Sequence, residues 1–114
     1  MKLKNCIKLS SSIKLYIPST IDTDKPMNNA DYVNEAMKLF SSFFGGATSS
    51  DALGSWISKN GSLIKEPVTL VFSFCNEADL KAKIDAVYDY CLTLKEDMRQ
   101  EAIALEVNGE LYLI

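Results

Sequence analysis

Apolar residues recur at spacings of three and four near the C-terminal third of the chain, and this pattern predicts a long amphipathic helix. The positions are Leu80, Ile84, Val87, Cys91, Leu94 and Met98. Residues three and four apart share one helix face, so these side chains form a single apolar stripe. Asn76 is the expected N-cap, with Asp79 three residues on in a variant of the capping box. Segments with strand character flank the helix, so its stripe is expected to pack on a sheet.

The N-terminal half shows one strand pattern and one further helix. Apolar and polar residues alternate from Ser12 to Ile17, as in a half-buried strand. A polar loop over residues 21–28 is expected to lead into a helix capped by Asn28 or Asn29. Its apolar stripe is Val33, Ala36, Met37, Phe40 and Phe44. Gly45 and Gly46 are expected to end it, because glycine readily adopts the left-handed conformation found at helix C-termini.

Two Asn-Gly pairs predict β-hairpin turns, since this dipeptide tolerates positive φ at both central positions. The first turn, over residues 59–62, joins a strand at 52–57 to a return over 63–66 and 68–75. Pro67 is expected to mark a bulge or an edge irregularity in that return. The second turn, Asn108-Gly109, joins strands over 103–107 and 110–114.

The order of these elements predicts an α+β fold. With right-handed crossovers it gives a ferredoxin-like (split βαβ) two-layer sandwich, in which two helices cover one face of an antiparallel sheet and a C-terminal hairpin strand is added. Residues 1–114 are expected to form one such domain; another two-layer α+β arrangement is the alternative. In the strand over 68–75 the bulkier set, which includes Phe72 and Phe74, is expected to face the helices. The opposite face would then be flat and free to form a homodimer.

Composition excludes several function classes. The 114 residues carry a net charge of −3, and Arg99 is the only arginine, so phosphate-directed binding of DNA or RNA is not expected. The chain contains no histidine, which excludes Ser-His-Asp and Cys-His catalysis. Cys6, Cys75 and Cys91 form no Cys-x-x-Cys pair, so neither a metal site nor a disulfide framework is predicted. No apolar run is long enough to cross a membrane, and reduced thiols suit a cytoplasmic protein.

A few residues stand out as candidates for ligand binding. Gly45, Gly46 and Thr48 can expose backbone N–H groups to an anion, although the segment lacks the lysine of a phosphate-binding loop. Tyr16 is expected to point outward from its strand, and Trp56 is either a core or dimer residue or the wall of a pocket. No catalytic residue, cofactor or metal ligand is predicted. The RNA-recognition module shares the topology, but it needs outward aromatic residues on two central strands and basic flanks.

Three segments carry a resemblance to a known group of proteins. They are Phe44-Gly45-Gly46-Ala47-Thr48, Gly54-Ser55-Trp56, and Glu106-Val107-Asn108-Gly109-Glu110. Together with Tyr16 to Thr20 they resemble small uncharacterised proteins of phages, plasmids and mobile elements of low-GC Gram-positive bacteria. The resemblance covers most of the chain. It implies a mobile-element context and assigns no role to a single residue.

Three functions follow as hypotheses. The preferred one is a non-catalytic binding protein, such as a counter-defence protein that occupies a host protein or sequesters a small molecule. The alternative is a small cofactor-independent enzyme of the dimeric ferredoxin-like barrel type, for which Tyr16, Trp56, Asn76 and Tyr88 could line a pocket. The third is a structural or regulatory subunit that acts through its dimer interface.

Overall fold

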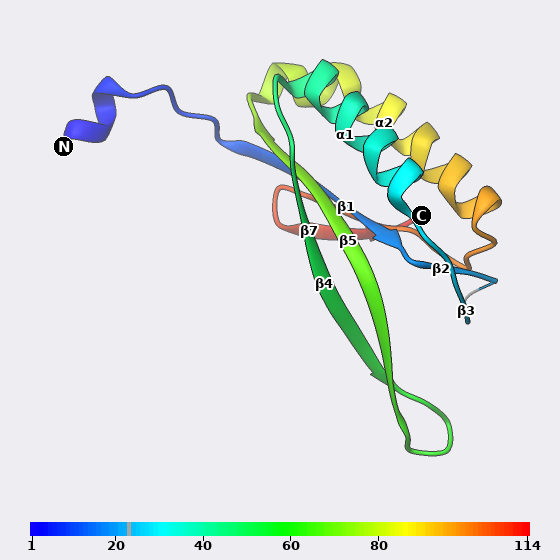
Figure 1. Ribbon diagram of the computed structural model, residues 1–114. Coiled ribbons are helices and arrows are strands. Elements are labelled where there is room, and N and C mark those ends of the chain that lie inside the picture. Colours follow the sequence, from blue (N-terminus) through cyan, green and yellow to red (C-terminus); the bar gives the residue numbers. More distant parts are fainter. Residues whose placement is uncertain (23) are drawn as a thin grey trace.

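The computed structural model describes residues 1–22 and 24–114, in which two α-helices and a five-stranded sheet form the body of the protein (Figure 1). The helices are α1 (Ala30–Phe44) and α2 (Glu77–Asp97), and a 3-10 helix spans Lys2–Asn5. The sheet consists of β1 (Ser11–Pro18), β4 (Thr48–Ile57), β5 (Leu63–Cys75), β6 (Ala104–Val107) and β7 (Glu110–Leu113). A separate small sheet pairs β2 (Thr20–Ile21) with β3 (Lys25–Pro26).

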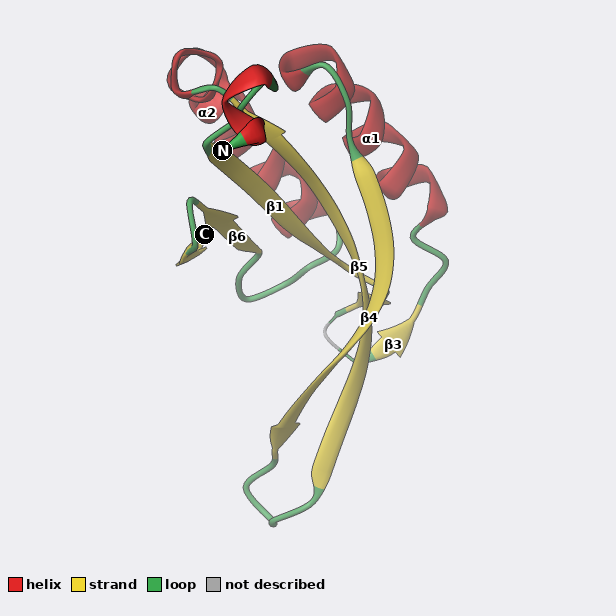
Figure 2. Ribbon diagram, turned by 90° about the vertical axis from the view of Figure 1, so that its left-hand side faces the viewer, coloured by secondary structure: helices red, strands yellow, loops and turns green. Residues whose placement is uncertain are grey.

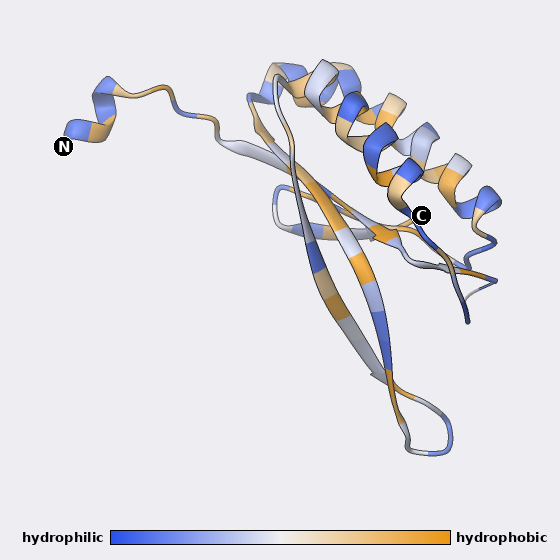
Figure 3. Ribbon diagram, in the orientation of Figure 1, coloured by the Kyte–Doolittle hydropathy of each residue, from blue (hydrophilic) through white to orange (hydrophobic). Residues whose placement is uncertain are grey.

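The five strands lie in the order β4-β5-β1-β6-β7, and every neighbouring pair is antiparallel. Both helices lie on one face of this sheet, as the two views show (Figures 1 and 2). The predicted two-layer α+β sandwich with a one-sided helix layer is therefore confirmed. Polar residues gather on the outward sides of the helices (Figure 3), as expected for amphipathic helices.

The core lies between the sheet and the helices. Helix α1 contributes Ala36, Phe40 and Phe44. The stripe predicted for α2 is also buried, except Ile84, which is only partly buried; the buried members are Leu80, Val87, Cys91, Leu94 and, at the C-cap, Met98. β1 contributes alternate residues, because side chains two apart share a face of a strand. The sheet side of the core consists of Ile13, Leu15, Ile17, Val71, Cys75, Ile103 and Leu105.

The local signals at element ends are confirmed. Gly45 adopts φ 86° at the C-cap of α1, and its N–H donates to the carbonyl oxygen of Ser41 at 2.9 Å. The Asn76 side chain accepts a hydrogen bond of 2.7 Å from the N–H of Asp79. Asn108 and Gly109 have φ values of 51° and 82°, as a tight hairpin turn requires.

The predicted facing of β5 is wrong. Ser73 lies opposite Ile13, and Val71 opposite Leu15, so these smaller residues point toward the helices. Phe72 and Phe74 point away from them, and the Phe74 side chain is 61% exposed. The strand register, set by pairing with the strongly apolar side of β1, outweighs the greater size of the phenylalanines. Aromatic rings therefore point away from the helices on two central strands, Tyr16 on β1 and Phe74 on β5, but the net charge of −3 still disfavours RNA binding.

Three boundaries also differ from the prediction. β4 begins at Thr48, four residues earlier than expected, because its polar residues still pair with β5. β5 runs through Pro67 in unbroken register with β4, without a bulge. This is tolerated because β1 ends opposite Val68, so no β1 residue needs the N–H that Pro67 lacks. The expected loop over 21–28 contains parts of β2 and β3, and Thr23 lies outside the described residues.

Two segments extend beyond the body of the fold. Residues 53–67 of the β4–β5 hairpin, here called the hairpin arm, project past the end of β1 (Figures 1 and 2). Residues 1–10, here called the N-terminal segment, are exposed and lead away from the sheet. They do not extend β1, which begins at Ser11.

Candidate functional site

Side-chain hydrogen bonds between distant segments concentrate at the C-terminal end of β1. The Asn29 amide donates to the carbonyl oxygens of Ile17 at 3.4 Å and Pro18 at 3.1 Å, and to the Thr69 hydroxyl at 3.2 Å. The Thr69 hydroxyl donates in turn to Asp51 at 3.2 Å. The Ser19 hydroxyl donates to the carbonyl oxygen of Pro67 at 2.6 Å. These bonds fix the end of β1 to the start of α1 and to the base of the hairpin arm.

An ion pair joins two unusual backbone positions beside this network. Asp22 and Arg99 both have positive φ, at 54° and 51°, a conformation that costs energy for residues other than glycine. One guanidinium nitrogen of Arg99 donates to both carboxylate oxygens of Asp22, at 3.2 and 3.3 Å. The Gln100 amide donates to the carbonyl oxygens of Thr20 and Met98 at 3.0 and 3.1 Å. Strained positions that surrounding contacts hold in place are common at functional sites.

A hollow of about 210 Å³ lies within this region and is here called the Tyr16–Glu66 hollow. Its walls come from the end of β1, the base of the hairpin arm and the segment between α2 and β6. Tyr16, Glu66 and Val68 lie on the face of the sheet that points away from the helices, here called the open face. The full lining is Tyr16, Pro18, Thr20, Glu66, Pro67, Val68, Gln100, Ala102, Ile103 and Ala104.

Glu66 supplies the negative charge of this hollow. Its cross-strand neighbour in β4 is Gly54, so no side chain of that strand stands directly opposite it. No Lys or Arg in residues 1–22 and 24–114 lies within ion-pair distance of its carboxylate. Glu106, the other carboxylate central on the open face, is paired with Lys14 at 3.8 Å. Glu66 is therefore the carboxylate available to a cationic ligand there.

Sequence reasoning did not single out Glu66, because one glutamate in a strand carries no motif. A two-residue turn at Asn60-Gly61 would place Gly54 opposite Pro67, whereas the longer turn observed after the pair Ile57 and Leu63 places it opposite Glu66. No local signal in the sequence therefore pointed to Glu66. Tyr16 does line the hollow, as its outward position on β1 suggested. Trp56 lies on the same face of the hairpin arm, two residues beyond Gly54, but is 52% exposed and outside the hollow.

The glycine-rich loop lines a second hollow, of about 420 Å³, at the opposite end of the sheet. Gly45, Gly46 and Thr48 come together there with Phe72 and Phe74. The Ser73 hydroxyl donates to the carbonyl oxygen of Gly46 at 2.6 Å, which holds the loop against β5. This glycine-loop hollow does not include Tyr16 or Trp56. The five candidate residues therefore do not form one site within a single chain.

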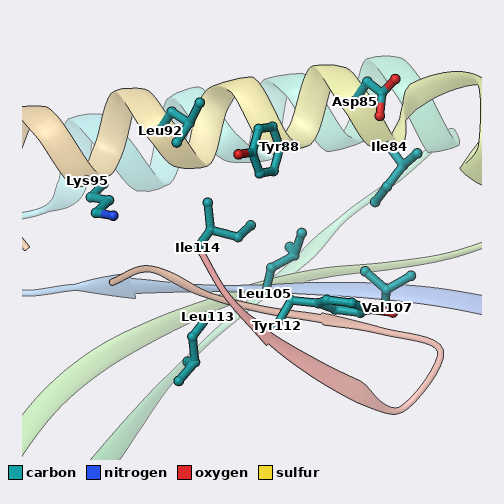
Figure 4. A pocket seen from close by; sticks show the side chains of 10 residues that line it. All are labelled: Ile84, Asp85, Tyr88, Leu92, Lys95, Leu105, Val107, Tyr112, Leu113 and Ile114. Atoms are coloured by element: carbon teal, nitrogen blue, oxygen red, sulfur yellow. The ribbon is translucent and has the colours of Figure 1, made fainter. Parts of the chain in front are cut away.

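A further hollow, lined mainly by apolar residues, lies between α2 and the C-terminal hairpin and measures about 650 Å³. Figure 4 shows Tyr88 on the helix above Tyr112 on β7, with Asp85 and Lys95 toward opposite ends. We call it the helix–hairpin groove; its lining is Ile84, Asp85, Tyr88, Leu92, Lys95, Leu105, Val107, Tyr112, Leu113 and Ile114. Its polar groups lie at the rim, so it offers a binding surface and no cluster of reactive side chains.

Other classes of site find little support in the described residues. Within 1–22 and 24–114, no three His, Cys, Asp or Glu residues gather as a metal-binding group would. None of the helices in this part of the chain is long and apolar enough to cross a membrane. Cys6, Cys75 and Cys91 are free cysteines. Burial raises the pKa of the Cys91 thiol to about 12, which disfavours the nucleophilic thiolate.

Comparison with known proteins reveals a likeness at the level of structure. No protein-family model and no curated protein matches the chain. A phage SAM lyase solved in complex with S-methyl-5'-thioadenosine superposes with a TM-score of 0.66 and 19% identity, over 95% of this chain and 91% of that one. A phage SAM lyase in the apo state gives a TM-score of 0.61, also at 19% identity, over 96% and 94% of the two chains.

These likenesses correct the preferred functional hypothesis. The sequence favoured a non-catalytic binding protein, because no catalytic motif was visible. The fold matched over nearly the whole of both chains is that of an enzyme, which contradicts that preference and favours the enzyme alternative. The sequence could not reveal this likeness, because a pocket that several strands build together leaves no local motif in composition or spacing.

Proposed function

We propose that this protein is an enzyme that cleaves S-adenosylmethionine (SAM), or a closely related sulfonium compound, in the Tyr16–Glu66 hollow. The observation that carries the proposal is the full-length likeness to a phage SAM lyase, which was solved with S-methyl-5'-thioadenosine. The hollow supports it independently, because it combines a carboxylate without an ion-pair partner and an aromatic ring. A sulfonium nucleoside offers a positive charge and a flat base to these two groups.

The chemistry of such a cleavage makes modest demands on the protein. SAM yields S-methyl-5'-thioadenosine when the carboxylate oxygen of its own methionyl group attacks the γ-carbon: the new C–O bond closes homoserine lactone while the bond between the γ-carbon and the sulfonium sulfur breaks and its electron pair goes to sulfur. Sulfur is then a neutral leaving group, so no metal or redox cofactor is required for this step. The enzyme has to bind the cation, exclude water and hold the departing carbon chain in a reactive conformation.

We assign to Glu66 the role of binding the positively charged sulfonium group. A carboxylate about 4 Å from a positive charge contributes about 4 kcal/mol at an effective dielectric constant of about 20. We assign to Tyr16 the role of stacking on the adenine ring, since stacking of a base on an aromatic side chain contributes about 1–3 kcal/mol. The Gln100 amide is held by two carbonyl oxygens, so its side-chain oxygen is available to ligand N–H groups.

The volume of the hollow favours a site completed by a second copy of the chain. At about 210 Å³ it is smaller than the 300–1,000 Å³ usual for small-molecule sites, so part of a nucleoside ligand would project over the open face. That face presents exposed apolar side chains, among them Phe74, Leu111 and Leu113. We therefore retain the proposed homodimer and place its interface on the open face.

The proposal also includes the type of sandwich fold and the biological context of the protein. We propose that the sandwich is of the ferredoxin-like (split βαβ) type, which is supported by a strand order in which β1 and β4 flank β5, and β5 and β6 flank β1. The mobile-element context suggested by the sequence is compatible with the phage origin of the matched enzyme. In the cytoplasm, removal of SAM would deprive SAM-dependent host enzymes of their substrate, which is a counter-defence action.

Incubation of the purified protein with SAM, followed by mass spectrometry, tests the proposal. We expect S-methyl-5'-thioadenosine to accumulate, and the Glu66→Gln variant to lose at least about 100-fold in kcat/KM, which corresponds to about 2.7 kcal/mol. Glu96→Gln, a matched change of an exposed carboxylate on α2, should retain full activity. Absence of turnover by the wild-type protein, or equal turnover by both variants, would contradict the proposal.

A further inference from the structure

The N-terminal segment has the composition of a docking peptide. Its apolar side chains lie in solvent, with Ile7 94% and Leu3 65% exposed. Lys2, Lys4 and Lys8 alternate with them, and no acidic residue occurs before Asp22. Apolar residues exposed to this degree cost free energy unless a partner covers them.

The helix–hairpin groove has the complementary character. Its floor is apolar, and its rim carries Asp85 toward one end and Lys95 toward the other, so the negative charge that the segment meets comes from helix α2 as a whole. Helix α2 carries six acidic residues against three lysines, a net charge of −3, which opposes the +3 of the N-terminal segment. β7 is the last strand of the sheet, so one of its edges has no hydrogen-bonded neighbour among the described strands and can accept an extended chain.

We propose that the N-terminal segment of one copy docks into the helix–hairpin groove of a second copy, with Leu3 and Ile7 on the apolar floor and the lysines toward the acidic residues of α2. The occupant is a second copy because of where the segment starts. Leu9 lies in the glycine-loop hollow with Phe44 and Thr48, at the α1 side of the sheet. The groove lies at the α2 side, and the residues before Leu9 lead away from the body (Figure 1).

The N-terminal segment is long enough to dock in this way. In the docked state the 3-10 helix over Lys2–Asn5 extends, and eight residues in extended conformation span roughly 26 Å at about 3.3 Å per residue. The groove runs from Asp85 to Lys95, ten residues or about 15 Å along a helix at 1.5 Å per residue. The segment is thus long enough to leave its own subunit and cover the length of a neighbouring groove. This docking does not depend on the proposed enzymatic function.

Disulfide trapping tests the proposal, because Cys6 is an exposed cysteine within the segment, whereas Cys75 and Cys91 are buried. The variant Leu92→Cys places a thiol at the groove. After mild oxidation we expect a link between Cys6 and position 92 that doubles the mass on a non-reducing gel, with the linked peptides identified by mass spectrometry. Asn34→Cys, on the exposed side of α1, is the matched control and should give only the background of the wild-type chain.

Two results would overturn the inference. A Cys6–92 link within one chain, at the monomer mass, would show that the segment folds back onto its own groove. No link above the Asn34→Cys background would show that the groove is not its partner. As a second test, Ile7→Asp should raise the dissociation constant of the oligomer at least tenfold in sedimentation equilibrium. This variant changes an exposed residue outside the core, so its folding is not at risk; an unchanged dissociation constant would count against docking.

Discussion

The two faces of the same sheet differ sharply, although alternate residues of the same strands form both. On the face covered by the helices, Ile13, Leu15, Ile17 and Val71 are completely buried. On the open face, Tyr16 is half-buried and Phe74 is largely exposed. The covered face is a dense core of aliphatic side chains, and the open face combines aromatic rings with the Lys14–Glu106 ion pair and the free carboxylate of Glu66.

This difference separates stability from function within one element. Residues on the covered face need only size and apolarity, and many combinations of them would fold. The open face carries large rings that the fold does not need to bury, together with charges that a core would exclude. An exposed apolar surface with a few charges is typical of binding sites and of interfaces between subunits. In each central strand, the residues on the covered face therefore form the core, and the residues on the open face form the proposed site.

The largest effect on stability is expected on the covered face. Leu15→Ala removes a fully buried side chain from β1 and leaves a cavity between the sheet and the helices. The free energy of unfolding should fall by about 2–5 kcal/mol. Urea denaturation followed by circular dichroism measures this, and a loss below about 1 kcal/mol would mean that this layer is not the core.

A smaller loss is expected at the junction of the two layers. Asn29→Ala removes the amide that bonds two carbonyl oxygens at the end of β1 and the Thr69 hydroxyl. Loss of these bonds should cost about 1–3 kcal/mol. The hollow beside them should also loosen, so KM for the substrate should rise. Asn34→Ala, an exposed asparagine on the same helix, is the control and should change neither quantity. Equal behaviour of the two variants would contradict the role of Asn29.

On the open face, the corresponding truncation of a side chain to alanine should hardly change the stability of the monomer. Phe74→Ala removes a larger side chain than Leu15→Ala, yet in dilute solution the free energy of unfolding should fall by less than about 1 kcal/mol. If the open face is an interface, the same variant weakens association in sedimentation equilibrium. A loss comparable with that of Leu15→Ala in the monomer would erase the distinction between the faces.

The smallest effect is a change in the pH dependence of stability at alkaline pH, and it arises from Tyr90 in the helix layer. Burial, reinforced by the charge of Glu35, raises the pKa of Tyr90, whose hydroxyl donates to the carbonyl oxygen of Tyr32. Tyr90 therefore stays neutral in the folded state while it ionises in the unfolded state near pH 10. Stability should accordingly fall as pH rises above about 10. Tyr90→Phe should flatten that fall between pH 8 and 11 in thermal denaturation, and an unchanged slope would contradict the assignment.

Local signals in the sequence predicted most of the fold. The helix of 77–97 follows from its periodicity and its Asn76 cap, and the Asn108-Gly109 turn follows from backbone conformation. At the first Asn-Gly pair, Gly61 has positive φ but Asn60 does not, and the turn is longer than two residues. The facing of β5 could not be predicted from size, because the core side of the strand is set by its register with β1. Ser73, a small polar residue, is buried because its hydroxyl bonds the carbonyl oxygen of Gly46, a contact that the sequence does not reveal.

The candidate site was harder to predict than the fold. Tyr16 and Glu66 are fifty residues apart and meet only because β5 extends beyond the end of β1. The Asp22–Arg99 ion pair depends on two left-handed residues other than glycine, for which the sequence offers no reliable signal. The glycine pair at 45–46, which does form a local pattern, serves mainly as a helix C-cap.

The most direct test of the central claim is to map where a substrate-like ligand binds. Titration of the isotope-labelled protein with S-methyl-5'-thioadenosine, followed by amide chemical shifts in NMR spectra, identifies the residues that respond. We predict shifts at Tyr16, Glu66 and Val68 and at 100–104, which Tyr16→Ala weakens because it removes the ring assigned to adenine, and which Glu96→Gln leaves intact. Shifts confined to the helix–hairpin groove around Tyr88, or no shifts at all, would contradict the account.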